Sequence, residues 1–210
     1  MKVNEIFKSI QGEGILMGLP TIFIRLTGCN LRCKWCDTTY SYYEGQEYSI
    51  EEIIEITKNL GIKRVCITGG EPLIQKDLGQ LLDKLLENDY SISIETNGSQ
   101  PIEWINKKIM ISLDIKCPSS MESDKMKFSN LEHLSFNDQC KFIIEDVTDY
   151  NFSLSIIKEY NLIKKTNVIF NPVGGIKARE LVDMVVQDNI DVRVGIQLHK
   201  IIWDKNTRGV

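Results

Sequence analysis

The stretch C-N-L-R-C-K-W-C, residues 29–36, places Cys29, Cys33 and Cys36 in the spacing C-x3-C-x2-C. A structural zinc ion usually takes four protein ligands in a tetrahedron, but this stretch supplies three thiolates and both histidines of the chain lie far downstream. Three thiolates suit a 4Fe-4S cluster in which one iron keeps an open position. The spacing therefore predicts a reactive iron–sulfur centre, with a zinc site, a disulfide or chance clustering as the alternatives.

Length and composition indicate one ordinary globular domain spanning residues 1–210. Hydrophobic residues make up 42 % of the chain and the formal net charge is −4, which gives no electrostatic reason to expect nucleic acid or an anionic membrane as a partner. We find no signal peptide and no apolar run long enough to span a bilayer. We therefore expect a cytoplasmic protein, in which reduced cysteines favour a cluster over disulfides.

Short β-rich runs alternate with amphipathic stretches along the chain. This alternation predicts an α/β fold with parallel strands and right-handed crossovers, and more specifically a partial (β/α) TIM-like barrel. In barrels the site lies at the carboxyl ends of the strands, where the polar motifs of this chain fall. We expect a mobile segment at 118–130. Strands are expected at 21–26, 64–68, 91–95, 109–115, 141–145, 167–170 and 192–197, and helices at 49–61, 78–86, 150–160 and 177–187.

A glycine-rich turn, Gly69-Gly70-Glu71-Pro72, follows the predicted strand 64–68. The two glycines allow close approach of the backbone to a ligand, and Glu71 or a free backbone carbonyl is expected to hold an ammonium group. On its own, this tetrapeptide is equally typical of a plain turn between a strand and a helix.

Together, the cysteine spacing and the G-G-E-P turn resemble the radical S-adenosylmethionine (SAM) superfamily over roughly residues 21–120. The resemblance implies that Cys29, Cys33 and Cys36 hold a 4Fe-4S cluster whose unique iron chelates the methionine part of SAM. It also implies that Trp35 lies near the adenine. Reductive cleavage of SAM would then give a 5′-deoxyadenosyl radical that abstracts hydrogen from a substrate.

The N-terminal loop 9–14 contains Q-G-E-G and resembles the 7-carboxy-7-deazaguanine synthase family of that superfamily. This family resemblance implies a lyase of 7-deazapurine (queuosine) biosynthesis, which contracts the ring of 6-carboxy-5,6,7,8-tetrahydropterin with loss of ammonia and needs Mg²⁺. Further segments match the same family: C-D-T at 36–38, E-T-N-G at 95–98, D-I-K-C-P-S-S at 114–120 and Q-L-H-K-I-I-W at 197–203.

The family resemblance also implies roles for individual residues. Thr38 would bind Mg²⁺, and Arg25 suits the substrate carboxylate because a guanidinium pairs with a carboxylate through two parallel bonds. A reductant such as flavodoxin or ferredoxin and a homodimer are implied as partners. The expected SAM contacts are Trp35, Cys36, Asp37, Gly69, Gly70, Glu71, Gly98, Asp114, Ile115 and Lys116, and the expected substrate contacts are Ile10, Gln11, Gly12, Glu13, Arg25, Thr96 and Val210.

Two other functions stay open at this point. Glycyl-radical-enzyme activases share the cysteine spacing, the G-G-E-P turn and a similar D-x-K segment, but the loop 11–14 and the segment 95–98 favour the synthase. A zinc-stabilised binding module is disfavoured by the missing fourth ligand.

Overall fold

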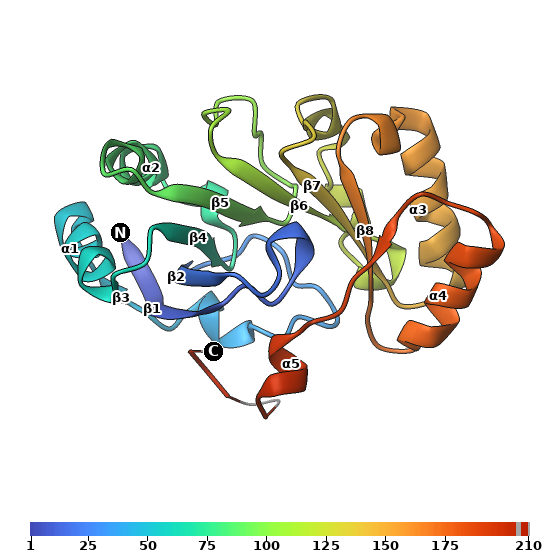
Figure 1. Cartoon of the computed structure of the whole chain (residues 1–210), viewed down its shortest axis with the longest axis horizontal. Helices are drawn as coiled ribbons and strands as arrows, with labels where there is room; N and C mark the ends of the chain where they lie inside the picture. Colours follow the sequence, from blue (N-terminus) through green and yellow to red (C-terminus); the bar gives the residue numbers. More distant parts are fainter. Residues whose placement is uncertain (205–206, 210) are drawn as a thin grey trace.

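The computed structural model describes residues 1–204 and 207–209, which form a curved, open sheet with helices along its outer side (Figure 1). Nine strands of this described part make one sheet in the order β3-β1-β2-β4-β5-β6-β7-β8-β9. The partial barrel expected from the sequence is confirmed. The strands are β1 Lys2–Ile10, β2 Pro20–Leu26, β3 Gln46–Glu47, β4 Arg64–Gly69, β5 Ser91–Thr96, β6 Met110–Lys116, β7 Gln139–Ile144, β8 Asn167–Pro172 and β9 Arg193–Val194.

From β2 to β9 every neighbouring pair of strands is parallel, as the strand–helix alternation predicts. The sequence did not predict the antiparallel edge, in which β1 pairs with both β2 and β3. The last strand, expected over 192–197, is limited to Arg193–Val194. Beyond it the chain leaves the sheet, and the Leu198 amide donates to the Gly12 carbonyl at 2.9 Å.

The helices form where the hydrophobic spacing predicts them, and α1 has both predicted caps. The Ser49 hydroxyl and the Glu52 side chain form a reciprocal capping box, and Gly61 ends the helix in the left-handed conformation. The helices are α1 Ile50–Leu60, α2 Leu78–Glu87, α3 Val147–Tyr160, α4 Ala178–Gln187 and α5 His199–Ile202, with 3-10 turns η1 Gly14–Leu16, η2 Thr39–Tyr42, η3 Pro72–Ile74, η4 Pro118–Ser120, η5 Ser123–Lys125, η6 Phe128–Glu132 and η7 Leu162–Lys164.

The segment 118–130, expected to be mobile, forms the turns η4 to η6 and supports the cysteine loop. The buried Asn130 amide donates to the carbonyls of Gly98 and Gln100 at 3.1 and 2.8 Å. The Ser120 carbonyl in turn accepts a hydrogen bond from the Lys34 amide at 3.1 Å. These buried contacts order a stretch whose composition alone is typical of a loop.

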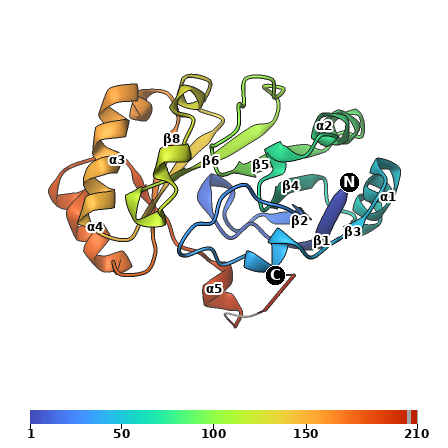
Figure 2. The ribbon, with the colours of Figure 1, turned by 180° about the vertical axis from the view of Figure 1, so that it is seen from behind.

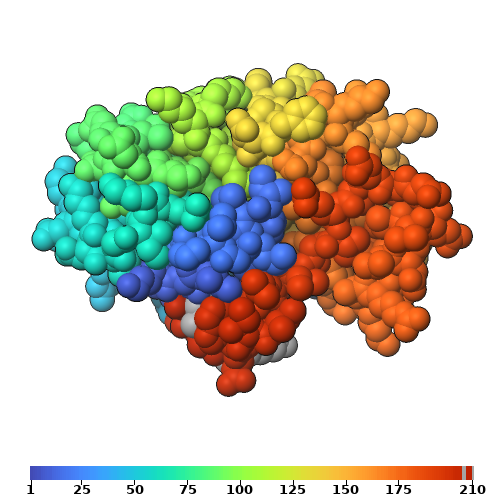
Figure 3. All heavy atoms as spheres, in the orientation of Figure 1, coloured from blue at the N-terminus to red at the C-terminus, as the bar shows by residue number. Residues whose placement is uncertain are grey.

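The N-terminal part of the chain and the C-terminal segment lie side by side on one face of the molecule. In both ribbon views the light-blue segment after β2 lies beside the red C-terminal segment (Figure 2), and red C-terminal atoms lie directly against blue N-terminal atoms in the space-filling view (Figure 3). Lys200 pairs with Asp37 at 2.7 Å, which joins these segments. No helix in the described part of the chain combines the length and the apolar character required to cross a membrane.

Candidate active site

A cavity of about 610 Å³ opens along the inner face of the sheet. Its walls come from the strands, the N-terminal loop, the cysteine loop and the C-terminal segment. The inner face is polar because strand residues alternate between the two faces: in β6, Ser112, Asp114 and Lys116 share one face while Leu113 and Ile115 face the apolar core. A barrel interior is ordinarily filled by apolar layers. Here the inward positions carry charged and amide groups, and they line a ligand-sized space.

The cysteine loop faces this cavity, as predicted. Cys29, Cys33 and Cys36 are all partly exposed and all line the cavity. The loop is held from both sides: the Gly28 amide donates to the Ser41 carbonyl at 2.8 Å, and the Arg32 amide donates to Glu122 Oε1 at 2.6 Å. These two hydrogen bonds fix the path of the loop along the cavity.

The three thiols fit a cluster better than a single metal ion. Among the described residues, no three Cys, His, Asp or Glu side chains gather around one point as a mononuclear metal site requires. In an iron–sulfur cube each thiolate binds a different iron, so the sulfurs need not converge. The Leu31 amide also points at Cys29 Sγ from 3.4 Å, a typical environment for a metal-bound thiolate. The donor set fits the cluster.

Glu71, the glutamate of the glycine-rich turn, has a structural role that the sequence did not predict. Glu71 is fully buried and does not line the cavity; its carboxylate accepts hydrogen bonds from the Leu73 amide at 2.9 Å, Thr96 Oγ1 at 2.8 Å and the Asn97 amide at 2.7 Å. Burial raises the pKa of Glu71 to about 7, against these three bonds. The carboxylate thus braces the end of β5, and the contact of Glu71 or of a backbone carbonyl with an ammonium group stays a prediction.

Gly70 lines the cavity, but the reason that this position requires glycine is a close contact within the protein. A Cβ at this position would collide with the Gly28 carbonyl oxygen, and the Glu71 amide donates to that same oxygen at 2.8 Å. The turn packs this tightly against the start of the cysteine loop. A side chain at Gly70 would push the cysteines out of position.

On the opposite wall, the predicted N-terminal loop meets the C-terminal segment. Gly12 has no room for a Cβ because the His199 imidazole packs against it. Gln11 is buried, and its amide nitrogen donates to Glu95 Oε1 at 3.2 Å. The Gln197 amide nitrogen donates to Glu13 Oε1 at 2.6 Å. The loop is therefore held by residues from β5 and from the C-terminal segment.

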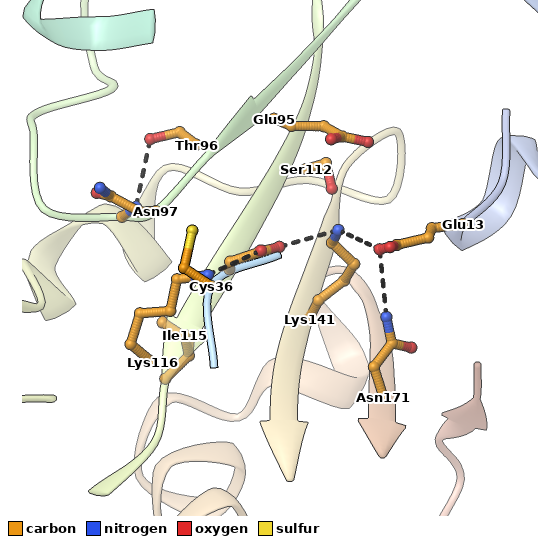
Figure 4. Close-up of polar contacts among 12 residues, drawn as sticks. Glu13, Cys36, Glu95, Thr96, Asn97, Ser112, Ile115, Lys116, Lys141 and Asn171 are labelled. Carbon is orange, nitrogen blue, oxygen red and sulfur yellow. Dashed lines mark hydrogen bonds and ion pairs between the residues drawn. The ribbon is translucent and has the colours of Figure 1, made fainter. Parts of the chain in front are cut away.

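A buried lysine that the sequence analysis did not assign crosses the cavity. Lys141 Nζ lies 2.9 Å from Glu13 Oε2 and 3.0 Å from Asp114 Oδ1 (Figure 4). Register explains the second contact, because Asp114 and Lys141 are direct neighbours on β6 and β7. Asp114 Oδ2 also pairs with Lys116 Nζ at 3.1 Å, and Lys116 lies 5.5 Å from the centre of the Trp35 ring. This row of alternating charges links the N-terminal loop to the cysteine loop.

The charges in this row stabilise one another. Burial alone would raise the pKa of Glu13 and of Asp114, but the nearby lysines hold both values below the ordinary range. Burial would likewise lower the pKa of Lys141, but the two carboxylates raise it well above its usual value. All three groups stay charged at neutral pH.

Arg25 lies on the inner face of β2, as predicted, and has a carboxylate partner from β1. Its Nε donates to Glu5 Oε1 at 2.7 Å, and its guanidinium carbon lies 5.9 Å from the ring centres of both Phe7 and Tyr40. Within the described residues, no hydrogen bond uses its two terminal nitrogens. These nitrogens are free to bind a ligand carboxylate.

Most predicted site residues meet in this one cavity. Gly98 and Ile115 do not line it: the Gly98 carbonyl accepts bonds from Lys127 and Asn130, and the Ile115 side chain is in the core. Val210 lies outside the described residues. The predicted residues that line the cavity are Ile10, Gln11, Gly12, Glu13, Arg25, Cys29, Cys33, Trp35, Cys36, Asp37, Thr38, Gly69, Gly70, Thr96, Asp114 and Lys116.

Several lining residues were missed, although the strand pattern contains a signal for them. Glu95, Lys141 and Asn171 each occupy an inward position on a strand, and each is polar where an outward neighbour is apolar. A charged residue in a strand that is buried on both faces indicates an internal polar site. Asn97, at the end of β5, has no such periodic signal.

The chain is similar to known proteins over its whole length. The model of the radical SAM superfamily matches residues 23–109. A 7-carboxy-7-deazaguanine synthase of Koribacter versatilis is 38 % identical over 100 % of both chains, and one of Clostridium acetobutylicum is 41 % identical over 100 % of this chain and 99 % of its own. The crystal structure of QueE from Escherichia coli has a TM-score of 0.73 at 24 % identity, covers 94 % of both chains and shows the same fold.

These full-length relatives decide between the alternatives left open by the sequence. Neither a glycyl-radical-enzyme activase nor a zinc-stabilised module is supported, because the similarity runs through the N-terminal loop and the C-terminal segment as well as the cysteine loop. The chain belongs to the 7-carboxy-7-deazaguanine synthase family of the radical SAM superfamily.

Proposed function

We propose that this chain converts 6-carboxy-5,6,7,8-tetrahydropterin into 7-carboxy-7-deazaguanine, with loss of ammonia, in 7-deazapurine biosynthesis. The observation that carries the proposal is the full-length similarity to synthases of that name, joined to a cavity that brings the cysteine loop and the N-terminal loop together. Superfamily membership implies a 4Fe-4S cluster and SAM. When bound, these groups supply the one-electron chemistry that removes a hydrogen atom from the substrate.

The cofactor half of the site lies around the cysteine loop. Cys29, Cys33 and Cys36 would hold the cluster. Lys116 lies over the Trp35 ring and fixes one wall for the nucleoside part of SAM. The backbone of Gly69 and Gly70, rather than the Glu71 carboxylate, is available for the methionine amino group, because both glycines line the cavity.

The substrate half offers one cation and one anion of fixed charge. The terminal nitrogens of Arg25 would bind the substrate carboxylate through two parallel bonds. Glu13, held ionised by Lys141, would accept hydrogen bonds from the N–H groups of the pterin ring. A pterin that carries a carboxylate matches this pair of groups.

Magnesium would bind between the two halves. Thr38 lines the cavity, and its hydroxyl lies 3.3 Å from Asp37 Oδ1. A single hydroxyl is a weak ligand, so the substrate carboxylate and water would complete the octahedron. The Lys200–Asp37 ion pair would limit the freedom of this segment.

We also propose a cytoplasmic homodimer that receives electrons from a small carrier such as flavodoxin or ferredoxin. These partners follow from the family and from the reductive chemistry. Size-exclusion chromatography with light scattering tests the dimer, and turnover with each purified carrier tests the donor.

The deciding experiment is an anaerobic incubation of the cluster-loaded protein with reductant, SAM, Mg²⁺ and 6-carboxy-5,6,7,8-tetrahydropterin, analysed by mass spectrometry. We expect many turnovers to 7-carboxy-7-deazaguanine, with SAM not consumed in proportion. SAM cleavage without this product would support the proposed radical chemistry but reject 6-carboxy-5,6,7,8-tetrahydropterin as the substrate. Neither cleavage nor product from a protein with a full cluster would reject the proposed function.

A further inference from the structure

Asn97 brings a side-chain amide to one of the cluster-binding cysteines. It follows β5 directly, it is only 7 % exposed, and it lines the cavity. Its Nδ2 lies 3.8 Å from Cys29 Sγ and 3.2 Å from Asn30 Oδ1. Nothing in the periodicity of the sequence marks this residue, and the proposed reaction gives it no role.

The orientation of this amide is fixed by its neighbours. Asn97 Oδ1 accepts hydrogen bonds from the Ser99 amide at 3.0 Å and from Ser99 Oγ at 2.6 Å, so the nitrogen of the same amide points the other way, toward Cys29. The backbone amide of Asn97 donates to the buried Glu71 carboxylate at 2.7 Å. Glu71 thus anchors the backbone and Ser99 orients the side chain.

An N–H group directed at a cluster thiolate has a predictable effect on the reduction potential. Reduction adds negative charge to the cluster and its sulfur ligands, so a donor stabilises the reduced state more than the oxidised state. Hydrogen bonds to the sulfurs are among the main determinants of cluster potential. The partners outside the ligand shell also orient the ligands themselves.

We propose that Asn97 is a positioning residue for the cluster: its side-chain amide donates to the Cys29 sulfur and raises the reduction potential, while Glu71 and Ser99 hold that amide in place. The proposal goes beyond the proposed function, because it needs the cluster that the superfamily implies but no particular substrate.

The test is the reduction potential of the cluster in the reconstituted full chain without SAM, followed by EPR during a redox titration. Asn97→Leu keeps a similar volume and no charge but removes the donor. At a fixed applied potential we expect a smaller reduced fraction, and a tenfold fall in the ratio of reduced to oxidised cluster corresponds to about 59 mV for a one-electron couple. Asn30→Ala is the matched control, since it removes one acceptor of the Asn97 side chain and leaves intact both the amide group and the Ser99 bonds that orient it.

Two results would overturn the proposal: an unchanged potential in Asn97→Leu, or an equal shift in Asn30→Ala, which would indicate loop shape rather than the donor. If Asn97→Leu assembles no cluster, the unaltered protein labelled with side-chain ¹⁵N asparagine gives a direct readout. Pulsed EPR of its reduced cluster should show a ¹⁵N coupling that persists in Asn30→Ala. The absence of that coupling would reject the hydrogen bond, whether or not the protein makes 7-carboxy-7-deazaguanine.

Discussion

Lys141 Nζ lies 2.9 Å from Glu13 Oε2, although the two residues are 128 positions apart in the chain. Lys141 is 2 % exposed, so the contact is shielded from water and from salt. Since Asp114 lies on the other side of the same ammonium group, one lysine pairs with two carboxylates from different parts of the site. The cavity walls depend on this cation.

Lys141→Met should destabilise the protein strongly, because it leaves the largely buried Glu13 carboxylate without its cation and leaves Asp114 with Lys116 alone. Breaking a buried ion pair from one side costs about 3–5 kcal/mol. Urea denaturation measures the loss. Lys58→Met, at an exposed position on α1, is the control and should change the free energy of unfolding by less than about 0.5 kcal/mol. Equal midpoints for the two variants would contradict the assigned role.

Glu71→Gln should change how stability depends on pH. The pKa of Glu71 is about 7 in the folded protein, above the ordinary unfolded value of about 4.3. An acid whose pKa is raised on folding stabilises the protein fully at a pH below its unfolded pKa. This stabilisation is lost as the pH rises toward the folded pKa of about 7. The stability of the parent relative to Glu71→Gln should therefore fall by on the order of 3 kcal/mol between pH 4 and pH 7.5.

Urea denaturation of both cluster-free proteins across that pH range tests this sign. Other titrating groups are common to the two proteins and cancel in the difference. Parallel stability profiles would show that Glu71 keeps an ordinary pKa.

Arg25→Ala should weaken substrate binding and leave the cluster in place. Loss of a charged hydrogen-bonded pair costs roughly 1.5–3 kcal/mol, so KM should rise about 10- to 100-fold. Arg25→Lys should recover only part of the loss, because an ammonium group lacks the planar fork. Iron content per chain is the control measurement. A KM equal to that of the parent would remove Arg25 from the substrate site.

Cys33→Ala should abolish cluster assembly, because it removes one of three thiolates on the cysteine loop. Cys140→Ala is the control: this thiol is fully buried in β7, away from the cavity. Iron and sulfide per chain, measured after anaerobic reconstitution, should fall sharply in the first variant and stay at the parent level in the second. Full occupancy in Cys33→Ala would reject the ligand assignment.

Thr38→Ala should alter the Mg²⁺ dependence of turnover. If the hydroxyl is a ligand, the concentration of Mg²⁺ that gives half-maximal rate should rise. Thr39→Ala, at the exposed neighbouring position, is the control and should leave it unchanged. An identical Mg²⁺ dependence in all three proteins would remove Thr38 from the metal site.

The fold was predictable where local signals agree with the tertiary structure. The helix α1 has its capping box, its apolar face and its terminal Gly61, and each is local in sequence. The pairing of β1 with β2 was not predictable from such signals. An antiparallel edge depends on which two segments come together in the folded protein, and no local motif specifies that pairing. The short β9 has the same origin, because the chain after Val194 is drawn away to Gly12.

The candidate site likewise has a part that was predictable from the sequence and a part that was not. The cysteine spacing identified its chemistry because the ligands lie within one loop. The structural role of Glu71 was not predicted, because the motif places the residue but not its carboxylate, which turns toward Thr96 and Asn97. Lys141 was missed because its partners come from distant segments, and only strand register brings Asp114 beside it.

The contact between the N-terminal loop and the C-terminal segment at the cavity also has a consequence for when the cluster is inserted during synthesis. Glu13 leaves the ribosome well before Gln197, which donates to it at 2.6 Å. Proteins emerge from the N-terminus, so the cysteine loop is exposed before Ser120 and Glu122 exist to support it. A nascent chain thus displays three thiols without a cavity around them. Productive cluster delivery is therefore expected only after residues 197 and 198 have been made and have closed against the N-terminal loop.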